Sequence, residues 1–272
     1  MLTESNMNQN TICLKSAYPA IPLATGLSYG GSQMWSDSAT IRKCGCGIVA
    51  ANDVLLYLQR KHQSLYSEMP DQETYCAQLK TLQHTCFPIL YPSGINGLLM
   101  VHGLNKLFRK KSLPYHASLA TKESLLISRI RTMLQNDIPV ILSIGPNFPR
   151  LWEKNGIGLY RKPVESDCNP GFSCQTFSHY VVATAMENKW LTVSSWGRKY
   201  HISISEYHEF VRDHSSFLFS NVIKIDNINR RDTWSFRLCP CDNYHYLFRI
   251  CVNRINTIKE AWLQYWILAG HQ

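Results

Sequence analysis

Apolar side chains recur at helical spacing along the first half of the chain. The segment over residues 46–60 is predicted to be a helix that buries an apolar face through Val49, Val54, Leu55 and Leu58. Asp71 follows a proline and is placed to cap the next helix. The predicted helices span residues 46–60, 71–82, 96–110 and 124–135.

From residue 139 the pattern changes to short apolar runs that are typical of strands. One short helix over residues 205–212, with Ser205 and Glu206 as capping candidates, interrupts them. Helices followed by antiparallel strands predict an α+β fold with a cleft between its two halves. The strand-like runs span residues 139–144, 157–162, 178–186, 190–195, 199–204 and 217–225.

The last part of the chain, residues 226–272, follows a different pattern. After a polar break at Arg230-Arg231-Asp232 comes an aromatic amphipathic stretch over residues 255–268, with Trp262 and Trp266 at helical spacing. We expect this helix to pack on the core. The alternative is that residues 255–268 dock on a partner or a membrane surface.

Composition narrows the possible partners. The chain has 272 residues, 45% of them hydrophobic and 17% charged, which suffices for one large core or two small lobes. A net charge of +9 would suit an anionic partner, but the basic residues are scattered. Their one tight cluster, Arg109-Lys110-Lys111, ends a predicted helix, where cations complement the helix dipole. We therefore expect no nucleic-acid function.

The sequence shows no secretory signal and no membrane span, and it therefore predicts a cytoplasmic protein. The N-terminal residues lack the basic-then-apolar order of a secretory signal, and no apolar run reaches the roughly eighteen residues of a membrane span. The 10 cysteines are therefore expected to be reduced thiols. Cysteine and histidine gather within residues 168–179 and, more favourably, 239–251, but without the usual ligand spacing of zinc sites. The sequence predicts no metal and no cofactor.

Cys46 stands at the start of the predicted helix 46–60, between Gly45 and Gly47. The positive end of a helix dipole stabilises a thiolate, so the pKa of this thiol is expected to be lowered. Thiolate is the reactive form of cysteine, and glycines let a backbone approach closely. Cys46 is therefore the candidate nucleophile, with Cys44 as the alternative. The competing interpretation is a buried structural thiol, because free cysteine is among the most buried residue types.

His179 begins a strand-like run and is the candidate general base. Ser194 is the candidate to orient its imidazole by accepting from Nδ1–H, although an inward-facing strand serine would look the same. Trp196 is expected either to cover this hydrogen bond from water or to belong to the core. Asp53, two helical turns after Cys46, is expected to be an internal partner for a basic residue.

Cys46, His179 and the sequence Ser194-Ser195-Trp196-Gly197 together resemble a papain-like cysteine peptidase. His179 and Ser194 follow Cys46 by roughly 130 and 150 positions, the separation typical of papain-type enzymes. The Cys46-Gly47 pair heading a long helix, and the buried strand within residues 137–145, are also similar to bacterial double-glycine leader peptidases and their stand-alone relatives.

The resemblance covers residues 26–225 and implies a peptidase domain there, after a loose lead-in over 1–25 and before a C-terminal extension over 226–272. It implies an α+β papain-like fold, in which an N-terminal helical lobe carrying the cysteine packs on a C-terminal antiparallel sheet carrying the histidine. The chain departs from the family at Ser194, where Asn or Asp is usual. It also has Thr40 where the oxyanion glutamine is usual, so Gln33 is the oxyanion candidate if residues 36–43 make an extra excursion.

The function that this resemblance implies is hydrolysis of a peptide or amide bond in a peptide or protein substrate, through a Cys–His acyl-enzyme mechanism. Two alternatives keep the same fold. One is an acyltransferase that uses the same pair of residues. The other is a catalytically degenerate protein that binds peptides or acts as a scaffold, as Ser194 and Thr40 would suggest.

Overall fold

The helix that begins at Cys46 lies at the centre of the structure. It spans Cys46–His62 (α2), and every residue from Gly47 to Gln59 is buried. The helix predicted over residues 46–60 is confirmed, but it buries all of its faces and not one apolar face alone. Helix α2 packs on the sheet and on other helices at once, so it is buried all round.

The computed structural model describes residues 11–62, 68–91, 94–120, 125–145, 156–161, 171–214 and 222–228. The chain divides into two compact units, Met1–Asn227 and Ile228–Gln272. Nearly all of the second unit lies outside the described residues, and with it the predicted helix 255–268 and the cysteines of residues 239–251.

The other four predicted helices are confirmed. They are α3 (Gln72–Thr85), α4 (Gly97–Lys110), α5 (Leu126–Gln135) and α6 (Ile204–His214). Asp71 caps α3 as predicted, because its carboxylate accepts from the N–H of Thr74 at 2.8 Å. The cap of α6 was expected at Ser205 or Glu206, but Ser203 provides the hydroxyl that accepts from the Glu206 N–H. Within the described ranges, no helix has the length and apolar character needed to cross a membrane.

The larger of the two sheets in the described residues is antiparallel. Its strands are Ile12–Cys13 (β1), Tyr115–Leu119 (β4), Val140–Ile144 (β5), Ile157–Tyr160 (β6), Phe172–Thr176 (β7), His179–Glu187 (β8), Trp190–Ser195 (β9), Arg198–Ser203 (β10) and Val222–Asn227 (β11). Their order is β4-β11-β5-β8-β9-β10-β6-β7, and β1 also pairs with β8. The α+β prediction is confirmed. Strands β1, β4 and β7 were not predicted, and two of them come from the half expected to be helical.

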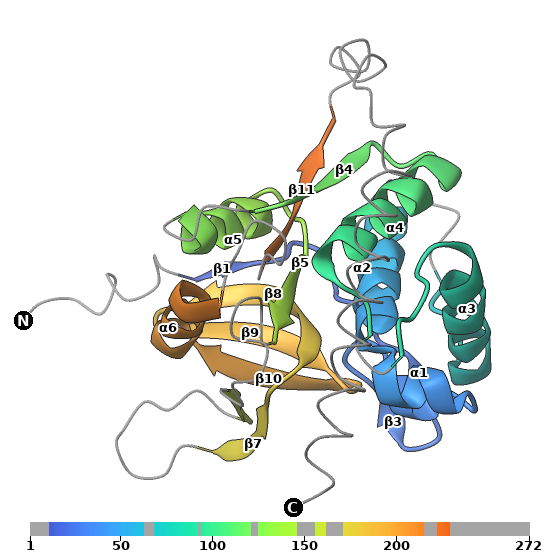
Figure 1. Cartoon of the computed structure of the whole chain (residues 1–272), viewed down its shortest axis with the longest axis horizontal. Coiled ribbons are helices and arrows are strands. Elements are labelled where there is room, and N and C mark those ends of the chain that lie inside the picture. The colour runs from blue at the N-terminus through green and yellow to red at the C-terminus, as the bar shows by residue number, and fades with distance from the viewer. Residues whose placement is uncertain are drawn as a thin grey trace, which may run out of the picture. The chain divides into compact units, whose positions relative to one another are not determined.

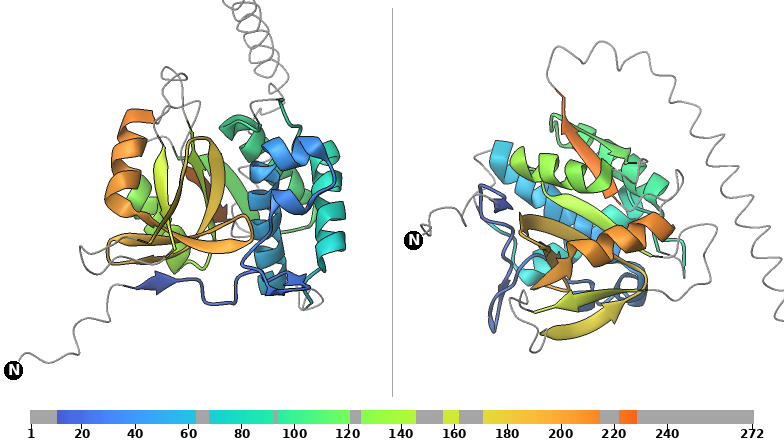
Figure 2. Two further views of the ribbon diagram at one scale, coloured as in Figure 1. Left: turned by 90° about the horizontal axis from the view of Figure 1, so that it is seen from below. Right: turned by 90° about the vertical axis from the view of Figure 1, so that its left-hand side faces the viewer.

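The helices lie on two sides of this sheet (Figures 1 and 2). Helices α2, α3, α4 and the short α1 (Ala39–Cys44) gather on one side of the sheet, while α5 and α6 lie apart from this group. Helix α2 contacts β8 and β5, α5 contacts β11 and β8, and α6 contacts β10 and β6. The packing of α2 on β8 brings the start of the cysteine helix to the start of the histidine strand.

The segment 11–25 is not the loose lead-in expected from the sequence. Ile12 pairs with Met186 of β8, and the Lys15 N–H donates to the Asp137 carboxylate at 2.7 Å. Tyr18 is buried in the core. A small hairpin of β2 (Pro22–Leu23) and β3 (Gly26–Leu27) then turns the chain toward α1. These residues belong to the first unit and, as shown below, they supply part of the candidate site.

Candidate active site

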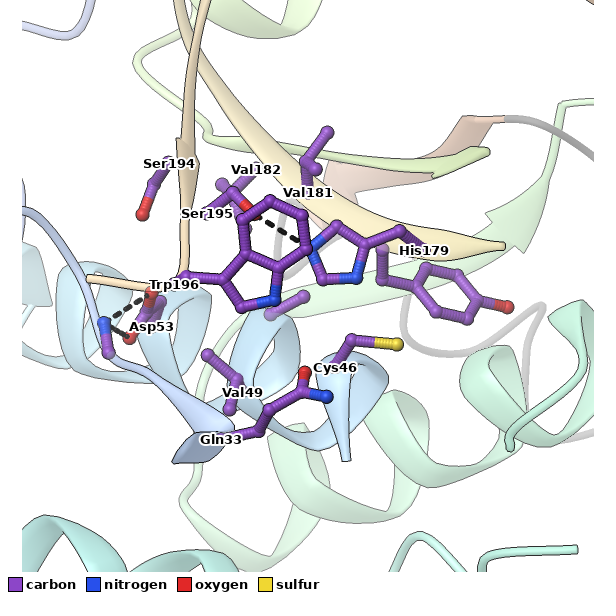
Figure 3. Close-up of a pocket in the computed structure, with 13 residues that line it drawn as sticks. Gln33, Cys46, Val49, Asp53, His179, Val181, Val182, Ser194, Ser195 and Trp196 are labelled. Carbon is purple, nitrogen blue, oxygen red and sulfur yellow. Dashed lines mark hydrogen bonds between the residues drawn. The ribbon is translucent and has the colours of Figure 1, made fainter. Parts of the chain in front are cut away.

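Cys46 and His179 line the same pocket, formed where the start of α2 meets β8 and the end of β9 (Figure 3). Cys44 lies buried at the end of α1 and is not among the lining residues. The geometry thus favours Cys46 over its alternative as the thiol that shares a pocket with the histidine. Further side chains around the pocket are those of Gln33, Val49, Asp53, Ser194, Ser195 and Trp196.

Two side chains contact the His179 imidazole, one at the edge of the ring and one on its face. Its Nε2 atom lies 2.7 Å from Ser195 Oγ. The Trp196 indole stacks on the imidazole with ring centroids 4.3 Å apart and planes inclined by 19°, and it also packs against the core. Only 7% of the His179 surface is exposed, and burial disfavours the charged imidazolium. The pKa of His179 is therefore lowered from 6.5 to about 4. The imidazole is therefore neutral at pH 7.

The serine that meets His179 is Ser195, not Ser194 as predicted. Ser194 Oγ donates instead to the Tyr29 carbonyl at 2.8 Å. Strand register explains the difference: Ser194 pairs with Val182, and paired residues share a face, so Ser194 lies on the face opposite to that of His179. The predicted use of Nδ1 is wrong too, because the serine engages Nε2. The two serines are adjacent and of the same type, so no local signal in the sequence separates them.

Trp196 occupies a turn conformation that few large residues adopt. Trp196 and Gly197 have φ of 48° and 73° and join β9 to β10, with Ser195 paired to Arg198. Such two-residue hairpins favour Asn-Gly because both central residues need positive φ. A tryptophan held there at an energetic cost, with its ring on the histidine, indicates a functional constraint at this turn.

The stack on His179 leads to a testable expectation for Trp196→Asn. Asparagine tolerates the turn better than tryptophan, so the hairpin should form while the imidazole becomes exposed. The His179 pKa should then rise from about 4 toward its ordinary 6.5, as followed by NMR titration of the ring protons.

The control for this titration is Trp190→Phe. Trp190 lies at the other end of β9, and its ring packs on Tyr160, with centroids 5.2 Å apart. This variant should leave the His179 pKa where it is. An unchanged pKa in Trp196→Asn would show that the indole does not desolvate the imidazole.

The thiol of Cys46 does not have the lowered pKa expected at a helix start. The backbone N–H groups of Gly47 and Tyr180 do favour the thiolate, but burial raises the pKa by more than these hydrogen bonds lower it. A raised cysteine pKa beside a lowered histidine pKa means that both groups are neutral near pH 7. The resting site is a thiol and an imidazole rather than an ion pair.

Gln33 lines the pocket because the chain between Gln33 and Cys46 makes an extra excursion. It lies in a 3-10 helix, Gln33–Trp35, and α1 occupies most of the interval before Cys46. Gln33 Nε2 donates to the Arg42 carbonyl at 2.8 Å, which fixes the carboxamide beside Cys46 in Figure 3. Thr40, at the position usual for the family, lies on α1 and is not among the lining residues.

Asp53 is not paired with a basic residue as expected. Both of its oxygens accept from the Gly31 N–H at 3.0 Å. The hydroxyls of Tyr75 and Tyr18 donate at 2.7 Å and 3.2 Å, and Tyr18 also bonds to the side chain of Ser194. Because Asp53 is 1% exposed, burial raises its pKa to about 6. Nothing in the sequence signals this cluster, since its members come from four separate segments.

In the part of the chain that the structure describes, no group of three His, Cys, Asp or Glu side chains could hold a metal ion. His179 and Cys174 lie there without forming such a group, whereas Cys168 and the cysteines of residues 239–251 fall outside the described residues.

Comparisons with known proteins give no assignment. No protein-family model matches the chain, and a search of the curated proteins finds no match.

Proposed function

We propose that the protein is a thiol-dependent hydrolase of peptide or amide bonds with a papain-like arrangement of its site. The observation that carries this proposal is one pocket lined both by Cys46, at the first turn of a buried helix, and by His179, whose Nε2 atom is held by Ser195. A nucleophile, a base and a group that orients the base are the parts that acyl transfer by cysteine needs.

The arrangement of elements supports a papain-like fold. The cysteine helix α2 packs on β8, which carries the histidine, and the β9–β10 turn places Trp196 on the imidazole. Cysteine, histidine, the orienting residue and tryptophan follow one another along the chain in the order of the papain-like pattern.

The neutral resting state decides how the first step would run. With Nε2–H donating to Ser195 Oγ, the lone pair on Nδ1 is the one left to accept the thiol proton. As Cys46 Sγ bonds to the substrate carbonyl carbon, its proton passes to Nδ1, and the tetrahedral intermediate carries a negative oxygen. Collapse of this intermediate breaks the C–N bond, and the leaving amine takes the proton from Nδ1. Water then hydrolyses the thioester with the same base.

The negative oxygen would be stabilised by hydrogen-bond donors that are already in place. The first N–H groups of α2 have no partner inside the helix, and the dipole of α2 favours negative charge there. The Gln33 carboxamide on the other side of Cys46 supplies a second donor. Donors fixed before the reaction are worth roughly 10²–10³ in rate each.

A minimal ester tests the proposal without knowledge of the natural substrate. With p-nitrophenyl acetate, the wild-type protein should release a burst of p-nitrophenolate and carry one acetyl group on Cys46, as located by mass spectrometry. Cys46→Ala should abolish the burst, and His179→Ala should slow it by roughly 10²–10⁴ because the base is lost. Cys44→Ala is the matched control and should keep the burst, since Cys44 does not line the pocket.

Acetylation spread over several cysteines, or a burst that ignores His179→Ala, would contradict the proposal. Hydrolysis and acyl transfer separate in the same assay, because an added amine that captures the acetyl group speeds turnover in proportion to its concentration.

One observation favours a second function, binding without catalysis. His179 has a serine rather than a carboxylate at its far nitrogen, and its pKa near 4 makes it a weak base. A degenerate papain-like protein would retain the pocket for binding a peptide. In that case wild type gives no burst, and Cys46→Ala leaves peptide binding intact.

A further inference from the structure

Asp53 is a buried carboxylate whose recorded hydrogen bonds all come from neutral donors. It lies on α2, two turns after Cys46, and accepts from the Gly31 N–H and the hydroxyls of Tyr75 and Tyr18. Burying a carboxylate is expensive unless the surrounding donors satisfy it. These donors come from the lead-in segment, from the loop before the 3-10 helix and from α3. Asp53 therefore ties three segments to the cysteine helix.

The loop held by Asp53 leads directly to Gln33. Gly31 stands two residues before it, and the Gly31 carbonyl accepts from the Gly197 N–H at 2.8 Å. The same backbone unit is thus fixed to α2 on one side and to the Trp196–Gly197 turn on the other. Neither Gly30 nor Gly31 has room for a side chain. A Cβ on Gly31 would overlap the Tyr75 hydroxyl, and one on Gly30 would overlap Ser194 Oγ and Asp53 Oδ2.

Gln33 has one amide hydrogen to spare. Its Nε2 carries two hydrogens, and one is used by the Arg42 carbonyl at 2.8 Å. The second is free to donate into the pocket, provided that the backbone at residues 31–33 stays in place. A donor misplaced by about 1 Å loses much of its effect on a transition state.

We propose that Asp53 is a positioning residue: it fixes the backbone at Gly31 and thereby holds the Gln33 carboxamide beside Cys46 as the oxyanion donor. This proposal rests on the proposed hydrolase function. Asp53 does not act as an acid or base toward the substrate. Its oxygens accept from the Gly31 N–H and the two tyrosine hydroxyls, and in Figure 3 the Asp53 side chain lies away from His179.

Two reactions of the same thiol distinguish positioning from general damage. Acylation of Cys46 by p-nitrophenyl acetate passes through an oxyanion, whereas alkylation by iodoacetamide does not. Asp53→Ala should slow acylation by roughly 10²-fold, the worth of one oxyanion donor, and leave the alkylation rate within about twofold. Asp53→Asn keeps an acceptor oxygen for Gly31 and should restore most of the acylation rate. Gln33→Ala should reproduce the loss, and combining it with Asp53→Ala should add little.

A loss of both reactions to the same extent in Asp53→Ala would overturn the proposal, because it would show a structural role alone. If that variant does not fold, Tyr75→Phe removes one donor to Asp53 and should slow acylation selectively by a smaller factor; equal slowing of both reactions overturns the proposal as well.

Hydrogen exchange separates a failure of this proposal from a failure of the proposed function. The Gly31 amide of the wild type should be protected, and Asp53→Asn should preserve that protection while Asp53→Ala or Tyr75→Phe reduces it. A wild type without an acyl-enzyme refutes the hydrolase function. Gly31 protection that does not respond to these changes refutes the positioning role, whether or not the protein is an enzyme.

Discussion

Replacing Ser195 with aspartate should raise the pKa of His179 from about 4 toward its ordinary 6.5 and speed acylation of Cys46 at pH 7 by roughly tenfold or more. Ser195 Oγ lies 2.7 Å from Nε2, so a carboxylate built there would face the imidazole directly. An opposite charge at this range favours the imidazolium. Each tenfold change in the protonation equilibrium corresponds to about 1.4 kcal/mol.

The increase follows from what limits the wild-type site. Burial favours the neutral form of both the Cys46 thiol and the His179 imidazole, and the Ser195 hydroxyl offers no charge to oppose this. A carboxylate would stabilise the imidazolium that forms during attack. Part of the gain is offset by the burial of the new charge, because Ser195 is 5% exposed. NMR titration of His179 and the burst with p-nitrophenyl acetate measure the two effects separately.

Two variants isolate the cause. Ser195→Asn can hydrogen-bond Nε2 without a charge, so it should leave the His179 pKa low. Ser194→Asp puts the same carboxylate on the other face of β9, beside Asp53, where it should destabilise the fold and leave the imidazole unaffected. If Ser194→Asp, rather than Ser195→Asp, raised the His179 pKa, the strand register described above would be wrong.

Local sequence patterns predicted the elements with strong local determinants. Helix α3 has its cap at Asp71, and strands β5, β8 and β9 are apolar runs. The elements that were missed depend on distant partners. Strand β4 is held by pairing with β11, from the other half of the chain, and β1 is two residues long and exists through its pairing with β8. Strand β1 is too short to show a periodic pattern, whereas β4 alternates apolar and polar residues from Tyr115 to Leu119, but over five positions only.

In the candidate site, the residue types were predicted and the register was not. Cys46 and His179 share a pocket, as their spacing suggested. Ser194 and Ser195 are adjacent residues of the same type. They differ in the face of β9 on which each side chain lies. A shift of one residue along a strand exchanges the two faces. The third residue of the site therefore depends on sheet pairing, which the sequence did not specify.

The pKa values could not be predicted from position along a helix. A helix start lowers the pKa of a thiol when the site is solvated, and this expectation failed for Cys46 because burial dominates. Asp53 shows the same limit. Its place on α2 is readable from the sequence, whereas its partners Gly31, Tyr18 and Tyr75 are brought to it by tertiary packing.

Gly31→Ala is the substitution with the largest expected effect on folding. A methyl group on Gly31 would overlap the hydroxyl of Tyr75, which is fully buried and bonded to Asp53. The overlap must displace the tyrosine or the loop, and either movement breaks a hydrogen bond to the buried carboxylate. We expect a loss of about 3 kcal/mol in the free energy of unfolding, from overpacking together with an unsatisfied buried polar group. Urea denaturation followed by circular dichroism measures it.

Gly145→Ala provides the matched control for this loss. An added Cβ there has its nearest neighbour at 3.8 Å, an ordinary van der Waals contact, so the free energy of unfolding should change by less than about 1 kcal/mol. Combining Gly31→Ala with Tyr75→Phe removes the overlapping hydroxyl and should recover part of the lost stability. If Gly31→Ala instead unfolds at the wild-type urea concentration, the loop cannot be held against α2 by the contacts between Gly31, Tyr75 and Asp53, and the positioning role of Asp53 fails with it.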